Sequence, residues 1–278
     1  MSKKTKLKSQ KPREKNVIIL IEGKSERTTF ELALPELFDQ IADDYRVHFP
    51  VIFEDEKEKG GDITSKYGIT PLTIIGCINK LFISKVLDET KIYARDIAEI
   101  IHIIDLDGAY IPDDNIRCGT NPNGEDKAYY AADSILTDDV QKITNRNQRK
   151  RENIEALLAL PNGKIRVWQN PENPKSKQYE VPYSIYYFSS NLDHFIHNDA
   201  NIPSGLSKVQ LAEAFRNGYI DDINGFIDFF MTDPNSAGEM SYSQSWAYIQ
   251  QRNLNSLTRR TNVDILLKRL ITVAQENK

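Results

Sequence analysis

Two stretches decide the fold of this chain: VIILIEG at residues 17–23 and IIHIIDLDG at residues 100–108. Each begins with a run of aliphatic residues and ends in acidic residues followed by glycine. Continuous apolar runs of this length are typical of strands that are buried on both faces, as in parallel sheets. Because the carboxyl ends of parallel strands line the ligand crevice of an open α/β sheet, we expect these acids at a functional edge.

Helix and strand patterns alternate outward from these two stretches. Thr70-Pro71 is a strong helix start, and Ser25 is the expected N-cap of an earlier helix that Pro35 kinks. Strands are predicted at residues 45–53, 98–105, 164–169 and 181–189, with a loop at 112–127. Helices are predicted at residues 26–41, 70–86, 147–160, 191–197, 207–230, 241–251 and 263–276. This order predicts an α/β fold, a parallel sheet flanked by helices with an α-helical C-terminal portion.

The pattern divides the chain into three parts. Residues 1–15 form a basic arm, read either as a solvated tail or as a contact for nucleic acid. Residues 16–197 form the α/β domain with inserted helices, and residues 198–278 form a helical region. Two roles fit the helical region, a homodimer surface and a substrate clamp.

The composition predicts a soluble cytoplasmic protein without membrane association. Hydrophobic residues make up 40% of the chain and charged residues 27%, and no apolar run approaches the roughly 18 residues of a membrane span. Cys77 and Cys118 lie far apart, without the spacing of a zinc site, which fits a reducing cytoplasm. His102, within an apolar run, is expected to be a buried, hydrogen-bonded histidine.

The spacing of the acids indicates a metal site. Asp105 and Asp107 are two residues apart, so their carboxylates point to the same side of an extended chain. Glu22 joins them if the two strands are neighbours. Carboxylates packed this closely repel one another unless a cation lies between them, and oxygen ligands without cysteine or a histidine cluster select Mg²⁺ or Mn²⁺. Either motif alone is better explained by strands that end at the surface, whereas the pair in this order favours a metal.

The two motifs together resemble the Toprim domain, in which a glutamate follows the first strand and a DxD motif follows the third. The EGxSE form at residues 22–26 and the helix inserted between the motifs resemble the OLD-family and RloB-like Toprim nucleases of bacterial anti-phage defence. The resemblance covers residues 16–107, and more loosely the chain to residue 197. It implies a Toprim-like, Rossmannoid sheet and a Mg²⁺-dependent endonuclease that uses Glu22, Asp105 and Asp107. DNA and RNA, transfer RNA included, are both candidate substrates.

The same resemblance implies two further metal ligands. Asp193 corresponds to an acid at the start of a later helix, although such families often carry glutamate there. Glu26 corresponds to a residue in the shell of the first metal ion. Both acids also lie in the first turn of a predicted helix, where a carboxylate stabilises the helix dipole, so both interpretations stay open. Lys24 is either a contact to the scissile phosphate or, the favoured interpretation, a loop lysine that faces solvent.

A basic segment at residues 142–177 is the candidate nucleic-acid surface. Its side chains form either a phosphate track toward the acids or a solvated helix face, and the residues concerned are Arg146, Arg149, Lys150 and Arg151. The chain lacks a GxxxxGK[ST] motif, which fits the separately encoded ATPase partner that the resemblance implies. Two alternatives to the nuclease stay open. One is a non-catalytic Toprim-like module that binds nucleic acid or a partner, and the other is a metal-dependent phosphatase or nucleotidyltransferase.

Overall fold

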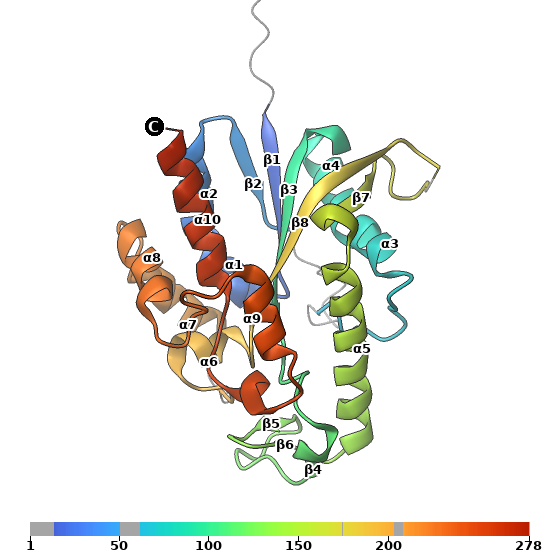
Figure 1. Ribbon diagram of the computed structural model, residues 1–278, viewed down its shortest axis with the longest axis vertical. Helices are drawn as coiled ribbons and strands as arrows, with labels where there is room; N and C mark the ends of the chain where they lie inside the picture. The colour runs from blue at the N-terminus through green and yellow to red at the C-terminus, as the bar shows by residue number, and fades with distance from the viewer. Residues whose placement is uncertain (1–13, 51–61, 174, 203–207, 278) are drawn as a thin grey trace, which may run out of the picture.

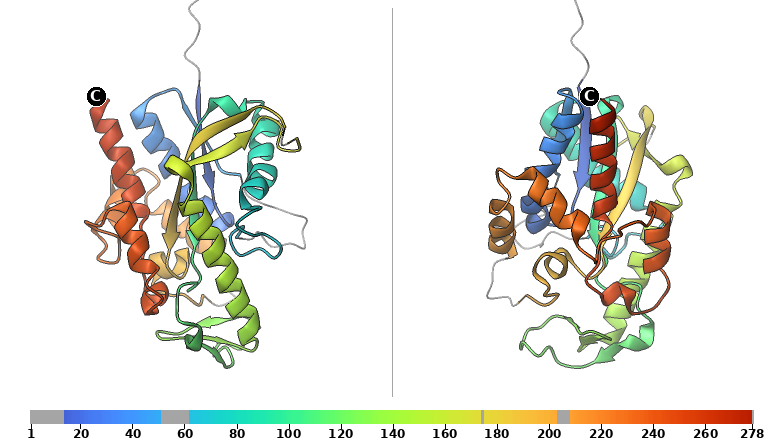
Figure 2. Two further views of the ribbon diagram at one scale, coloured as in Figure 1. Left: turned by 45° about the vertical axis from the view of Figure 1, so that its right-hand side comes forward. Right: turned by 60° about the vertical axis from the view of Figure 1, so that its left-hand side comes forward.

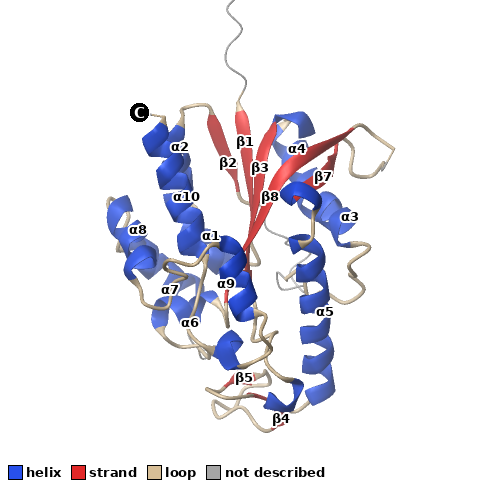
Figure 3. Cartoon of the chain, in the orientation of Figure 1, coloured by secondary structure: helices blue, strands red, loops and turns tan. Residues whose placement is uncertain are grey.

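The central element is a five-stranded sheet in the order β2-β1-β3-β8-β7, as Figure 3 shows. The computed structural model describes residues 14–50, 62–173, 175–202 and 208–277, and all counts refer to these ranges. The strands β1 (Lys15–Leu20), β2 (Tyr45–His48), β3 (Ile97–Asp105) and β8 (Gln178–Phe188) run parallel. The edge strand β7 (Lys164–Trp168) is antiparallel to β8. The predicted α/β class is therefore confirmed, and the strand predicted at residues 164–169 is present but runs antiparallel, a direction that the sequence did not predict.

The strand order reverses between β1 and β3. From β1 the chain forms β2 on one side, and then crosses to form β3 on the other side of β1. In open α/β sheets a crevice opens at such a reversal, outside the carboxyl ends of the strands. Glu22 follows β1 and Asp105 ends β3, so both acids lie at this point.

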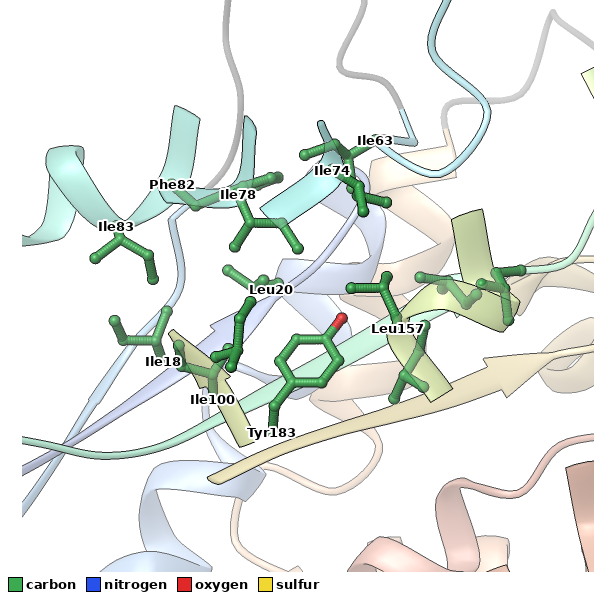
Figure 4. Close-up of a cluster of buried hydrophobic side chains, with 14 of the residues drawn as sticks. Ile18, Leu20, Ile63, Ile74, Ile78, Phe82, Ile83, Ile100, Leu157 and Tyr183 are labelled. Atoms are coloured by element: carbon green, nitrogen blue, oxygen red, sulfur yellow. The ribbon is translucent and has the colours of Figure 1, made fainter. Parts of the chain in front are cut away.

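Helices cover both faces of the sheet (Figure 1). One face carries α1 (Lys24–Phe30), α2 (Ala33–Ile41), α8 (Ile223–Thr232) and α10 (Val263–Glu276). The other carries α3 (Ile74–Ile78), the π-helical η1 (Asn79–Ile83), α4 (Ser84–Thr90), α5 (Val140–Leu158) and α9 (Tyr242–Ile249). The alternation of side chains along β1 explains both layers, because Val17 and Ile19 face α2 whereas Ile18 and Leu20 face α3. Figure 4 shows the buried apolar side chains on the face that α3 covers, with Leu157 of α5 packed near the sheet.

The C-terminal helices share the core of the sheet. Leu266, Leu267 and Leu270 of α10 are buried in the same cluster as Phe38 of α2 and Ile101 of β3. The shorter helices α6 (Leu192–His197) and α7 (Lys208–Asn217) lie between the end of β8 and α8. Within the helical region, α8 and α10 therefore complete one layer of the sheet, and α9 belongs to the other.

A small second sheet begins within the predicted loop at residues 112–127 and continues beyond it. It consists of β4 (Ile116–Cys118), β5 (Tyr129–Tyr130) and β6 (Ile135–Thr137), in the order β4-β6-β5. Figure 2 shows this sheet beside the start of α5, beyond the ends of the main strands. The predicted loop is therefore confirmed for most of its length, and the three strands were missed because strands of two or three residues are too short to produce a recognisable alternation.

Several predicted helix bounds also differ from the structure. The first helix is interrupted at Glu31–Leu32, and Pro35 lies in the first turn of α2, where proline is tolerated. Gly23 takes the N-cap position of α1, and Ser25 lies inside the helix. The second helix begins at Ile74, after a turn at Thr70–Thr73.

Other predicted bounds are partly confirmed. The helix at residues 263–276 matches α10, whereas α5 begins earlier than predicted, at Val140, and the described part of the helix predicted at 207–230 is divided between α7 and α8. Lys15 belongs to β1 and not to the predicted arm. Residues 1–13, and residues 51–53 of the second predicted strand, lie outside the described ranges.

Candidate active site

Glu22 and Asp105 meet at the carboxyl edge of the sheet, as their positions predict. The backbone N–H of Asp105 donates to Oε1 of Glu22 at 2.9 Å. The backbone N–H of Leu192, at the start of α6, donates to Oδ1 of Asp105 at 2.9 Å. These two carboxylates therefore tie together the ends of β1 and β3 and the beginning of α6.

Three side chains hold Asp107 beside Glu22 and Asp105. Its backbone is left-handed, with φ 52°, a conformation that aspartate tolerates better than most residues. Nζ of Lys150 lies 2.7 Å from Oδ2, and the hydroxyl of Tyr130 donates to Oδ1 at 3.1 Å. Nη2 of Arg146 donates to the backbone carbonyl of Asp107 at 2.8 Å. The next residue, Gly108, is also left-handed, and a Cβ there would lie 2.8 Å from the side chain of Leu257.

Lys150 is the centre of a first group of three carboxylates, which we call the Lys150 cluster. Its side chain is fully buried, and Nζ lies 2.7 Å from Asp107, 2.9 Å from Oδ2 of Asp62 and 3.8 Å from Oε1 of Glu22. Asp62 was not predicted as a site residue. It is one of ten acids between residues 31 and 62, and nothing local distinguishes it from the others.

Lys208 forms the centre of a second group, the Lys208 cluster, with Glu26, Asp105 and Asp193. Its Nζ lies 2.6 Å from Oδ2 of Asp193, and its side chain is 49% exposed. Burial alone would lower the pKa of Lys208, but the charges of Asp193, Asp105 and Glu26 raise it above its usual value. Glu26 is buried, and the hydroxyl of Ser25 donates to its Oε2 at 3.2 Å. Lys208 was also absent from the predicted residues.

The two clusters differ in how well their negative charge is compensated. Burial, reinforced by neighbouring carboxylates, raises the pKa of Asp105 and Glu22 well above the usual range, and burial also raises the pKa of Glu26. Burial acts on Asp107 in the same direction, but Lys150 and Arg146 together lower its pKa below the usual value. Asp105, Glu22 and Glu26 therefore lie where an additional cation would be stabilising.

The acids fit Mg²⁺ or Mn²⁺ in donor type and in charge. Carboxylate oxygens are the ligands that these ions prefer, and a divalent cation would offset the burial and the mutual repulsion that raise the pKa values of Glu22 and Asp105. As they stand, no three Asp, Glu, His or Cys side chains of the described residues are arranged to hold a metal ion. The oxygens around Lys150 lie at ammonium distances, whereas Mg²⁺ needs about 2.0–2.1 Å. A bound ion would have to draw the acids closer.

The four basic residues of α5 that were predicted to contact nucleic acid do not form one surface. Lys150 and Arg151 are buried, so neither belongs to a solvated helix face, and Arg151 donates to the carbonyl of Ala109 at 2.6 Å. Arg146 points at Asp107 and Tyr130. An exposed phosphate track through Lys150 and Arg151 is therefore wrong.

Arg149 differs from its neighbours because it lies beside an exposed aromatic ring. Its guanidinium is 5.8 Å from the ring centroid of Tyr67, which is 90% exposed, and it donates to the carbonyl of Ser65 at 3.2 Å. Lys24 is exposed at the start of α1. Arg149 and Lys24 are thus the predicted nucleic-acid contacts that solvent can reach most readily.

Comparison with known proteins adds no relative. No protein-family model, curated protein or solved structure gives a significant match to this chain. The fold and the site define a class, an α/β protein with a cluster of acids where its strand order reverses. The Toprim resemblance rests on the motifs at residues 22–26 and 105–107.

Proposed function

We propose that this protein is a metal-dependent endonuclease that hydrolyses phosphodiester bonds in DNA or RNA. Glu22, Asp105 and Asp107 would hold Mg²⁺ or Mn²⁺, with Glu26 and Asp193 as further ligands. The observation that carries the proposal is the convergence of these carboxylates at the reversal of strand order, with too little positive charge to balance them. The Toprim resemblance of the two motifs supports it independently.

The chemistry divides between the ion and the chain. A bound divalent ion stabilises charge on the phosphate and lowers the pKa of a bound water. The chain positions the ligands, because the Asp105 amide orients Glu22 and the start of α6 orients Asp105. Lys150, Arg146 and Tyr130 fix Asp107.

Tyr67 and Arg149 suit the polymer part of the substrate. An exposed aromatic ring stacks on an unpaired base, and an arginine beside it contacts phosphate or stacks as well. Both residues are close in sequence to the site, because Tyr67 lies five residues after Asp62 and Arg149 precedes Lys150 in α5. We therefore propose that the nucleic acid reaches the acids along this side of α5.

The biological setting is proposed from the resemblance alone. It implies an effector of anti-phage defence in the cytoplasm, working with a separately encoded ATPase. Across residues 14–50, 62–173, 175–202 and 208–277, no helix has the length and apolarity to cross a membrane. Co-purification of the chain with an ATPase encoded beside it would test the partnership.

Cleavage of plasmid DNA and total RNA in the presence of Mg²⁺ or Mn²⁺ tests the activity. Asp105→Asn is the most informative variant, because the amide oxygen can still accept from Leu192 while the charge is lost. Asp88→Asn is the matched control, because Asp88 is exposed on α4. We expect cutting by the wild type and the control, and a decrease of about 100-fold or more for Asp105→Asn.

Other outcomes separate the alternatives. Equal cutting by the wild type and Asp105→Asn would contradict the proposed site. Nucleic-acid binding without cutting, unchanged by Glu22→Gln and without Mn²⁺ binding in calorimetry, would support the non-catalytic module. Hydrolysis of mononucleotides alone would support a phosphatase.

A further inference from the structure

We propose that Lys150 permanently occupies one of two cation positions in the site, so that the protein binds one divalent ion per chain. The inference rests on the proposed function, because it assigns the charges of that same site. Sites with two metal ions place them about 3.5–4 Å apart to stabilise both sides of a phosphoryl transfer. Here the Lys150 cluster already holds a cation, and the Lys208 cluster is the position that a metal ion can enter.

The first support is the geometry of Lys150. Its ammonium lies 2.7 Å from Asp107 and 2.9 Å from Asp62, which are charge-assisted hydrogen-bond distances. Its side chain has no exposed surface. An unpaired buried ammonium costs several kcal/mol, so a lysine is retained in such a place only among matching charges.

The second support is the way α5 fixes the surroundings of Lys150. Asn153, one turn further along α5, donates to the carbonyls of Thr64 and Ile69 at 2.8 and 3.2 Å. These bonds attach the loop that carries Asp62 to the helix that carries Lys150. Withdrawal of the ammonium would therefore require α5 and this loop to separate.

The third support is the contrast with Lys208. The side chain of Lys208 is 49% exposed, whereas that of Lys150 is 0% exposed, and both ammonium groups contact a carboxylate at hydrogen-bond distance. Arg146 adds a second positive charge beside Asp107. Asp107 and Asp62 are thus compensated, whereas Lys208 can withdraw into solvent and leave Glu26, Asp105 and Asp193, with Glu22 beside Asp105, to an ion. Lys150 is accordingly a positioning residue, which holds Asp107 and Asp62 without touching substrate, and Asp107 then supports the metal site through Lys150 and not as a direct ligand.

Mn²⁺ binding to Lys150→Met, measured by calorimetry together with thermal unfolding, tests the inference. We expect one Mn²⁺ per wild-type chain and two per Lys150→Met chain. The metal-free variant should unfold at a lower temperature than the wild type, and Mn²⁺ should restore most of the difference. Lys208→Met is the matched control, for which we expect one ion, bound several-fold more tightly. If metal-free Lys150→Met does not fold, refolding in Mn²⁺ should recover it.

Three outcomes bear on the inference in distinct ways. Two ions in the wild type would overturn it. A Lys150→Met variant that still binds one ion, and that Mn²⁺ does not restabilise, would show a structural role only. A wild type without Mn²⁺ binding would contradict the proposed nuclease and the count of one ion, and a gain of one ion in Lys150→Met would then still show that Lys150 occupies a cation position.

Discussion

At the scale of single residues, Asp107 shows how the site combines backbone and charge. Its left-handed conformation costs about 1–2 kcal/mol for most residues, and Asp and Asn bear it best. In return its side chain and carbonyl accept from Lys150, Tyr130 and Arg146. The DxD motif predicts that Asp107 is a site residue. It does not predict these three partners, because they come from sequence positions 23 to 43 residues away.

Asp107→Ala should destabilise the metal-free protein by about 2–4 kcal/mol in urea unfolding. Removal of one partner of a buried ion pair costs about 3–5 kcal/mol, and Asp62 and Glu22 still compensate Lys150 in part. Asp107→Asn should lose less stability than Asp107→Ala, because asparagine tolerates the left-handed backbone. Asp133→Ala is the control, because its ion pair with Arg117 is exposed, and it should unfold like the wild type. Equal losses for Asp107→Ala and Asp133→Ala would contradict this account.

At the scale of elements, β1 and β3 were predictable because long apolar runs identify buried strands without tertiary information. The register of α5 was also present in the sequence. Residues 143, 147, 150, 154 and 157 recur at intervals of four and three, which places Lys150 on the buried face with Ile154. The basic character of α5 favoured an exposed helix instead. The pairing of Lys150 with Asp62 was not predictable, because it joins positions 88 residues apart in sequence.

The middle of β3 carries a prediction about pH. His102 is buried, as expected, and its Nδ1 lies 2.7 Å from the hydroxyl of Tyr183. Burial lowers the pKa of His102 from 6.5 to about 4. The unfolded chain therefore takes up the proton first, so stability is complete above about pH 6.5 and is lost as the pH falls toward about 4. The loss should be on the order of 3 kcal/mol.

His102→Gln separates this effect from the other titrations. Glutamine can still hydrogen-bond to Tyr183 but does not take up a proton in this range. Urea unfolding at several pH values between about 7 and 4 should show a smaller loss of stability for the variant than for the wild type. The same dependence on pH in both proteins would mean that His102 does not titrate as its burial indicates.

At the scale of the whole molecule, the sheet and the C-terminal helices form a common structure. Residues 198–278 read as a separate helical region in sequence, because helices follow one another there without strands. In the structure the N–H of Ser189, just after β8, donates to the carbonyl of Arg260 at 2.8 Å, and α10 then packs on the face of the sheet that α2 also covers. Which helices cover which face depends on contacts between distant segments, and local periodicity does not contain that information.

Leu267→Ala tests whether the molecule unfolds as one unit. Leu267 is fully buried in the cluster that joins α10 to α2 and β3, so truncation should cost about 2–5 kcal/mol. Leu254→Ala is the control, because Leu254 is 37% exposed and should change stability much less. Because α10 is part of one layer over the sheet, the loss of stability should shift the entire urea unfolding curve to lower urea concentrations and leave a single transition. Circular dichroism and the fluorescence of Trp168 and Trp246, both packed on the opposite face of the sheet, should shift together. An early helical transition that leaves the tryptophan signal unchanged would instead show that α10 unfolds independently, and the cluster of acids at the end of the sheet could then form without it.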